Sequence, residues 1–201
     1  MPRCRTRFAL AALIGLTGLV LVGQGLWIHA KALLAQVLLA RAFAETIASG
    51  APVKPWRWAD TWPVARIAVP RLGREAIALA GASGQALAFG PGHLPQTPEA
   101  GDPGTAVYAA HRDTHFAFLA EVAIGDEIRV TRRDGRVVRF RVTHTSIVRH
   151  DAAALDPHAP GRRLVLATCW PLDARTDGPL RYLVHAETVE DQKMPAPDPS
   201  H

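Results

Sequence analysis

Hydrophobic residues follow a different pattern in the first part of the chain than in the rest of it. Residues Phe8 to Ile28 form a run of twenty-one positions without a charged side chain. A helix of this length is long enough to cross the hydrocarbon core of a bilayer. Arg3, Arg5 and Arg7 precede the run, and basic residues favour the cytoplasmic side. We therefore expect a single-pass signal anchor at residues 8–28, behind a cytoplasmic basic N-terminus at residues 1–7.

A cleaved signal peptide is the alternative for the same segment. Ala30-Lys31-Ala32 offers the small-x-small pattern of a cleavage site. The apolar run is longer than the usual core of a signal peptide, which favours the uncleaved anchor. Either way, the chain beyond about residue 30 is exported.

Residues 29–63 read as a helical stalk followed by a linker. Hydrophobic residues recur at near-helical spacing up to Ile47, and Ser49-Gly50 with Pro52 supplies the stop. The linker contains three tryptophans among prolines and basic residues, namely Trp56, Trp58 and Trp62. Two placements of these rings stay open, at the bilayer interface or packed over the first strand of the following domain.

Beyond residue 63, short runs with the period of a strand replace the helical pattern. No alternation of helices and strands interrupts them, which favours a closed or nearly closed antiparallel barrel. We expect the barrel at residues 64–190 and a disordered, Pro-rich tail at residues 191–201. A long loop rich in Gly and Pro runs from Phe89 to Gly104. The expected strands are Val64–Pro70, Glu75–Ala80, Thr105–Ala110, Glu127–Val130, Val137–Val142, Leu164–Cys169 and Tyr182–Val184, and Asp134-Gly135 forms a hairpin turn between the fourth and fifth.

The net charge of +5 is concentrated at the N-terminus. Residues 1–50 hold five Lys/Arg and one Asp/Glu, which gives +4, and the remaining residues give only +1. The expected barrel therefore lacks the basic footprint of a nucleic-acid-binding domain. Six arginines lie on the expected hairpin, and a solvent-exposed face is a better interpretation of them than a binding site for an anionic ligand. These arginines are Arg129, Arg132, Arg133, Arg136, Arg139 and Arg141.

One thiol stands out in the exported part of the chain. If Cys4 stays in the cytoplasm, Cys169 has no disulfide partner. Cys169 ends an apolar strand, Arg181 begins the next strand, and His111 ends an earlier one. Together they permit acyl transfer: a thiolate attacks a carbonyl, an imidazolium protonates the departing amine, and Arg181 stabilises the oxyanion or holds the substrate backbone. Thr168 can support the same site through its amide or hydroxyl.

Each of these residues also has an ordinary structural interpretation. A free cysteine is more often a small buried apolar residue than a nucleophile. His111 can be a structural residue at a strand end, and Arg181 a partner in a surface ion pair. His93 lies in the Gly/Pro-rich loop, where a histidine hydrogen-bonded to the backbone is the better interpretation.

The joint pattern resembles the sortases, which are membrane-anchored cysteine transpeptidases. The similarity extends from about Val64 to Glu187 and is closest to the sortases of Gram-negative proteobacteria. The motifs that carry it are Phe89-Gly90-Pro91-Gly92-His93-Leu94, His111-Arg112-Asp113-Thr114-His115-Phe116, Leu166-Ala167-Thr168-Cys169 with Pro171, and Gly178-Pro179-Leu180-Arg181-Tyr182.

This resemblance implies an eight-stranded sortase β-barrel on the periplasmic side of the inner membrane. Cys169 would attack the Thr-Gly bond of an LPXTG-like C-terminal sorting signal on an exported protein and form a thioacyl-enzyme. His111 would act as general acid and base, and Arg181 would orient the substrate and stabilise the oxyanion. An amine acceptor in the cell envelope would then resolve the intermediate, without a cofactor.

Departures from the family pattern keep alternatives open. Ala110 stands before His111 where a glycine is common, and the segment from Trp170 to Leu180 is longer than in many Gram-positive sortases. A hydrolase that uses water and a catalytically silent, membrane-tethered barrel that binds envelope peptides are the rival functions. A metal site of His111, His115 and Cys169 is disfavoured, because the residues between the two histidines read as a loop rather than a helix.

Overall fold

The computed structural model describes the backbone of residues 2–151, 155–174, 176 and 178–189, and the side chains of these residues from Leu13 onward. The chain divides into two compact units, residues 1–38 and residues 39–201. The tail predicted to be disordered, residues 191–201, lies outside the described residues.

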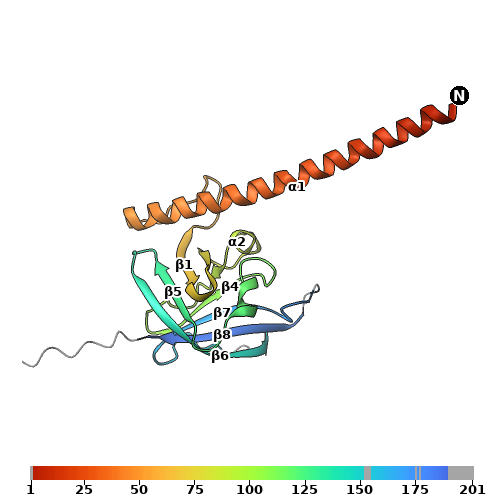
Figure 1. Cartoon of the computed structure of the whole chain (residues 1–201). Coiled ribbons are helices and arrows are strands. Elements are labelled where there is room, and N and C mark those ends of the chain that lie inside the picture. The colour runs from red at the N-terminus through yellow and green to blue at the C-terminus, as the bar shows by residue number, and fades with distance from the viewer. Residues whose placement is uncertain (1, 152–154, 175, 177, 190–201) are drawn as a thin grey trace, which may run out of the picture. The chain divides into compact units, whose positions relative to one another are not determined.

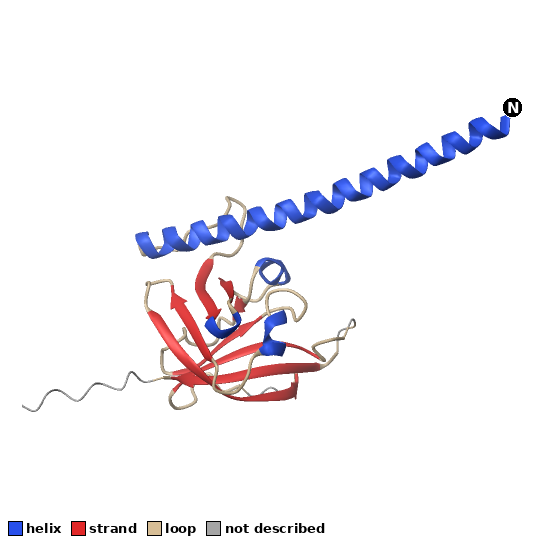
Figure 2. Cartoon of the chain, viewed as in Figure 1, coloured by secondary structure: helices blue, strands red, loops and turns tan. Residues whose placement is uncertain are grey.

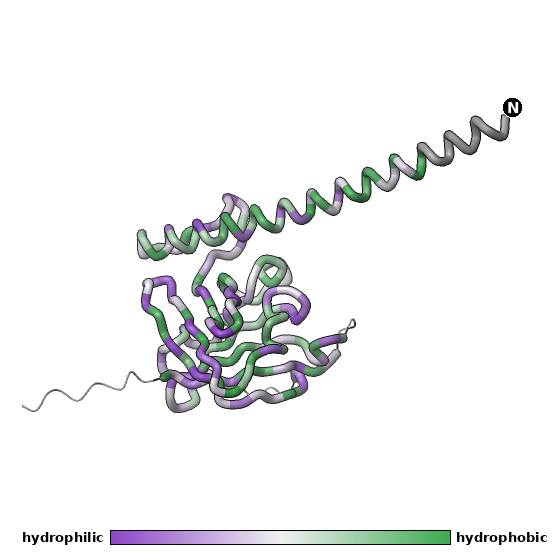
Figure 3. The backbone as a smooth tube through the Cα atoms, viewed as in Figure 1, coloured by the Kyte–Doolittle hydropathy of each residue, from purple (hydrophilic) through white to green (hydrophobic). Residues whose placement is uncertain are grey.

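The N-terminal helix α1 (Pro2–Ser49) is a single continuous element (Figure 2). It covers both the expected anchor and the expected helical stalk, without a break between them. Hydrophobic residues dominate its described part (Figure 3), and its large apolar side chains from Leu13 to Ile28 are more than half exposed. By length and composition alone, Leu13–Ser49 is long and apolar enough to cross a membrane. The expected stop is confirmed, because Gly50 has a left-handed φ of 72° and its amide donates to the Thr46 carbonyl.

The end of α1, within the predicted stalk, belongs to the second unit. Leu39 and Phe43 are buried there, and Leu39 packs with Leu79 and Ala86. The linker after Gly50 is irregular up to Pro63, as expected. Trp56 packs edge to face on Phe89, with the ring centres 4.9 Å apart, and Trp58 is 80% exposed.

Eight strands close into a barrel, which confirms the predicted fold (Figure 1). Their order around the barrel is β1-β2-β3-β4-β7-β8-β6-β5, and β1 closes it by pairing with β5. The strands are β1 (Pro63–Val69), β2 (Arg74–Ala80), β3 (Gly92–His93), β4 (Gly104–Ala109), β5 (Glu127–Arg132), β6 (Val137–Arg149), β7 (Arg162–Trp170) and β8 (Leu180–Thr188).

The expectation of a purely antiparallel barrel is wrong at two places. Strands β2 and β3 pair in parallel, and so do β4 and β7. Alternation of apolar residues identifies a strand but carries no information on its direction or its neighbour. The long connection from β4 to β7 contains the whole β5–β6 hairpin and returns the chain in the direction of β4.

Short elements inside the expected loops were also missed, since each is too brief to show a period. Helix α2 (Gly84–Phe89) begins at Ser83, whose hydroxyl accepts from the Ala86 amide. Strand β3 lies inside the Gly/Pro-rich loop. A Cβ atom on Gly92 would lie 2.3 Å from the Gly81 carbonyl oxygen, so the close approach to the end of β2 requires glycine. Two 3-10 helices, η1 (Pro70–Leu72) and η2 (Ala117–Glu121), complete the structure.

The strands bury one face inside the barrel and turn the other outward. Inward side chains form the main core, which includes Ile67, Phe140, Leu166 and Val184. A second apolar cluster lies on the outer face of β4, β7 and β8, where Val107, Val165 and Leu183 pack with Leu94 and Leu155 from neighbouring loops. This outer face therefore has a covering of loops, and the covering forms the walls of the cavity described below.

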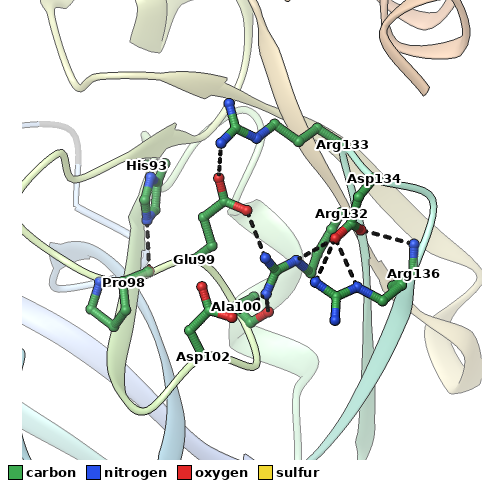
Figure 4. A network of polar contacts seen from close by, with 9 residues as sticks. All are labelled: His93, Pro98, Glu99, Ala100, Asp102, Arg132, Arg133, Asp134 and Arg136. Carbon is green, nitrogen blue, oxygen red and sulfur yellow. Dashed lines mark hydrogen bonds and ion pairs between the residues drawn. The ribbon is translucent and has the colours of Figure 1, made fainter. Parts of the chain in front are cut away.

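One hairpin arginine departs from the expected solvated face. Five of the six are exposed, but Arg132 is only 8% exposed. Its guanidinium donates to the Ala100 carbonyl at 3.0 Å, to Asp102 at 2.7 Å and to Glu99 at 2.9 Å (Figure 4). Arg133 binds the other oxygen of Glu99 at 2.7 Å. Arg132 thus fastens β5 to the loop that enters β4.

We expect replacement of Arg132 by leucine to lower the free energy of unfolding by about 1–3 kcal/mol, because the Ala100 carbonyl, Asp102 and one oxygen of Glu99 lose a donor. The same replacement at Arg136, whose side chain is 71% exposed, should change it by no more than about 0.5 kcal/mol. Chemical denaturation of the detergent-solubilised full chain measures both. Equal effects of the two substitutions would contradict the structural role of Arg132.

Candidate active site

The predicted catalytic residues lie on one row across three neighbouring strands. In β7, Leu164, Leu166 and Thr168 are buried in the barrel, so Cys169 faces outward. The register places Cys169 directly opposite Arg181 on β8. On the other side, the parallel ladder pairs Ala109 of β4 with Ala167, and the Ala110 amide continues it by donating to the Ala167 carbonyl at 3.1 Å. His111 therefore follows at the level of Cys169.

This row lines a cavity of about 570 Å³ on the outer face of the sheet. Leu87 from α2, Leu94 from the β3–β4 loop and Leu155 from the β6–β7 loop make its apolar wall. His111, Cys169 and Arg181 stand at its polar end. The arrangement gives an extended peptide an apolar subsite beside a partly exposed thiol.

A larger hollow of about 690 Å³ lies at the far ends of β7 and β8. Its described lining includes Arg162, Arg163 and Glu187, but no cysteine or histidine. The chemistry of the smaller cavity, rather than size, makes it the candidate active site.

Thr168 connects the two strand ends that carry His111 and Cys169. Its side chain is 2% exposed, and its hydroxyl donates to the Ala110 carbonyl at 2.8 Å. The hydroxyl is thus engaged between β4 and β7, while Thr168 itself is part of the cavity lining. Of the two contributions predicted for Thr168, through its amide or its hydroxyl, the hydroxyl is already engaged as a donor to Ala110.

Arg181 is held at the cavity by backbone carbonyls. One guanidinium nitrogen donates to the Gly178 and Leu180 carbonyls, both at 2.9 Å. Among the described residues, no carboxylate pairs with Arg181. Arg181 lines the cavity, where a guanidinium can interact with an anion.

Comparison with known proteins identifies the family of the chain. The family model of the sortase domain matches residues 67–189. The chain belongs to the sortase family. Sortase D from Bacillus subtilis (strain 168) is 26% identical over 122 residues, which cover 60% of this chain and 61% of that protein.

Solved sortase structures share the barrel. Sortase A from Corynebacterium diphtheriae superimposes with a TM-score of 0.58 at 25% identity, covering 73% of this chain and 66% of that one. Sortase C-1 from Actinomyces oris gives a TM-score of 0.56 at 27% identity, covering 63% and 72%. The chain spans just under two thirds of the length of Sortase D and of the corynebacterial chain.

Two further residues, one beside His111 and one in the lining of this sortase cavity, were given no role from the sequence. Arg112, directly after His111, is 8% exposed and donates to the Thr176 carbonyl at 2.8 Å, so it braces the loop between Cys169 and Arg181. His150, at the end of β6, lines the cavity itself. The sequence gives no sign of the burial of Arg112, because arginine is usually exposed. The sequence offered one indication that Arg112 has a role, namely that it directly follows His111.

The other histidines near the motif lie apart from the thiol. His115 lines a separate hollow with Glu75 and Glu121, and burial lowers the pKa of this imidazole. His111, His115 and Cys169 therefore do not converge on one point, and the described residues contain no group of three or more potential metal ligands. His93 forms a 3.0 Å hydrogen bond with the Pro98 carbonyl, in agreement with the structural role preferred for it (Figure 4).

The role of the Thr168 hydroxyl in this sortase can be tested with two substitutions. Thr168→Val keeps the shape but leaves the buried Ala110 carbonyl without its donor, so we expect a loss of about 1–3 kcal/mol in the free energy of unfolding. Thr168→Ser keeps the hydroxyl and should lose less. A Thr168→Val protein with wild-type stability in chemical denaturation would show that the contact with Ala110 contributes nothing to the fold.

Proposed function

We propose that this sortase is a membrane-anchored cysteine transpeptidase of the proteobacterial class, with residues 64–190 as the catalytic barrel. Membership of the sortase family supports cysteine transpeptidase chemistry in general. The observation that carries the specific proposal is the row His111, Cys169 and Arg181 across β4, β7 and β8, at the polar end of a cavity with an apolar wall.

In the first half-reaction, the Cys169 thiolate attacks the threonine carbonyl carbon of an LPXTG-like sorting signal. The carbonyl oxygen becomes negatively charged beside Arg181, whose cation stabilises it. The carbon–nitrogen bond to glycine then breaks as His111 donates a proton to the departing amine. A thioester between the substrate protein and Cys169 results.

In the second half-reaction, an amine of the cell envelope attacks the thioester. His111, now neutral, takes a proton from the attacking amine, and the carbon–sulfur bond breaks to release the thiolate. The substrate protein leaves with a new amide bond, and both residues return to their starting states. The apolar wall of Leu87, Leu94 and Leu155 suits the Leu-Pro portion of the signal.

Helix α1 supports the proposed location, a single-pass anchor in the inner membrane with the barrel on the periplasmic side. Its large apolar residues from Leu13 to Ile28 are exposed, and three arginines precede them in the sequence. A sorting signal carried by an exported protein would meet the barrel in that compartment.

Mass spectrometry of the full chain after incubation with a Leu-Pro-Glu-Thr-Gly peptide tests the nucleophile. We expect an adduct equal in mass to the peptide without its glycine portion, located on Cys169. Cys169→Ala should form none, whereas Cys4→Ala, which removes the other cysteine of the chain, should form it like the wild type. An adduct on the Cys169→Ala protein would refute the assignment.

Product analysis with and without an added amine separates transfer from hydrolysis. We expect triglycine to appear in an amide-linked product at the expense of the free acid, because amine and water compete for the same thioester. A free acid as the sole product at every amine concentration would identify a cysteine hydrolase. No cleavage and no adduct, together with peptide binding, would identify a silent peptide-binding barrel.

A further inference from the structure

Arg112 connects the end of β4 to the loop between β7 and β8. It directly follows His111 and is 8% exposed, and one of its guanidinium nitrogens donates to the Thr176 carbonyl at 2.8 Å. Arginine is rarely buried so deeply, because removing its charge from water costs free energy. An apolar side chain would fill the same space without that cost. The contact with the loop is therefore what distinguishes Arg112 from a residue that only packs.

The loop that Arg112 contacts also determines where Arg181 lies. Thr176 is two residues from Gly178, whose carbonyl accepts from the Arg181 guanidinium at 2.9 Å. The carbonyl of Leu180, the first residue of β8, accepts from the same nitrogen at 2.9 Å. Because this backbone holds the guanidinium, a shift of the backbone would move the guanidinium as well. A chain of contacts thus leads from Arg112, through the loop, to the side chain proposed to stabilise the oxyanion.

Contacts from two sides hold the chain where it enters β8. On the β6 side, the His150 amide donates to the Pro179 carbonyl at 2.8 Å. On the β4 side, Arg112 donates to Thr176. Strand β8 itself is held by its ladder with β7, which extends to the pair of Leu180 with Trp170. Loss of the Arg112 contact should therefore leave the barrel intact and release only the loop beside Arg181.

We infer that Arg112 is a positioning residue, which holds the Arg181 guanidinium where the oxyanion forms. This inference rests on the proposed function and adds to it a residue that the described lining of the cavity does not include. Arg112 therefore acts through the loop rather than on the substrate. Stabilisation of an oxyanion depends steeply on geometry, and a displacement of about 1 Å lowers a rate about 100-fold.

Single-turnover formation of the Cys169 thioester, with the full chain and the Leu-Pro-Glu-Thr-Gly peptide, tests this role. We expect Arg112→Leu to lower the rate constant at saturating peptide by about 10- to 100-fold, because the oxyanion exists only during the reaction. The half-saturating peptide concentration should change by less than about twofold, since ground-state binding does not use the oxyanion contact. Arg112→Lys keeps a donor on a long side chain and should recover part of the rate.

Arg132→Leu is the matched control for the loss of a buried arginine. Arg132 has the same exposure, 8%, but it binds the loop that enters β4. We expect this variant to lose stability and to keep the wild-type rate constant per folded molecule. An equal loss of rate in Arg112→Leu and Arg132→Leu would reject the inference.

A double-mutant cycle separates positioning of Arg181 from a general structural role. If Arg112 acts through Arg181, Arg112→Leu should change the rate constant by less than about twofold in the Arg181→Ala background. A structural role that is independent of Arg181 would instead cost the same factor in both backgrounds. That additive result would reject the inference.

NMR relaxation of the Arg181 side-chain Nε–H group separates the failure of this inference from the failure of the proposed function, because it requires no chemistry. In the full-length Cys169→Ala chain without peptide, we expect Arg112→Leu to lower the order parameter of this group and Arg132→Leu to leave it unchanged. A lower value supports positioning by Arg112 even if the wild type forms no thioester, an outcome that would reject the transpeptidase instead. An unchanged value in Arg112→Leu, with normal thioester formation by the wild type, would reject the inference and leave the transpeptidase intact.

Discussion

The parallel pairing of β4 with β7 is the constraint on which the candidate site depends. Strands in parallel end at the same edge of the sheet, so the residues that follow them in sequence meet there. The pairing of Ala109 with Ala167 therefore fixes His111 at the level of Cys169. A shift by one residue would turn Cys169 into the barrel and Thr168 outward. The buried bond from the Thr168 hydroxyl to the Ala110 carbonyl stabilises this register at the position where it matters.

The two faces of the same strands have different roles: the inner face stabilises the barrel, and the outer face carries the candidate site. Inside the barrel, residues such as Leu166 and Val184 are completely buried and hold the sheet in a fixed shape. Outside, the apolar cluster around Val165 and Leu183 allows loops to pack on the sheet. These loops exclude water from one side of the cavity, while the strand ends present polar groups on the other. A rigid sheet and an adaptable loop layer thus meet at the thiol.

Much of this arrangement was predictable from the sequence, and the failures have physical reasons. The strand ending at Cys169 and the hairpin through Asp134-Gly135 follow from alternation and turn chemistry, which are local properties. The direction of β7 relative to β4 is a property of two segments separated by the β5–β6 hairpin, so alternation alone does not specify it. Helix α2 and strand β3 are too short to show a period. His150 was overlooked because its relation to Cys169 arises only from the registers of β6 on β8 and of β8 on β7.

Three arginines of this sortase show why residue type alone does not define a role. Arg132 is buried between Glu99 and Asp102, and these carboxylates compensate the cost of removing its charge from water. Arg112 reaches across the fold to a loop carbonyl and braces the backbone. Arg181 contacts only backbone carbonyls among the described residues, which orient the guanidinium without neutralising it. A positioned positive charge stabilises a negative charge that appears beside it during a reaction. Of the three, Arg181 is the one in the described lining of the Cys169 cavity, and its backbone contacts hold the guanidinium where the proposed mechanism requires an oxyanion partner.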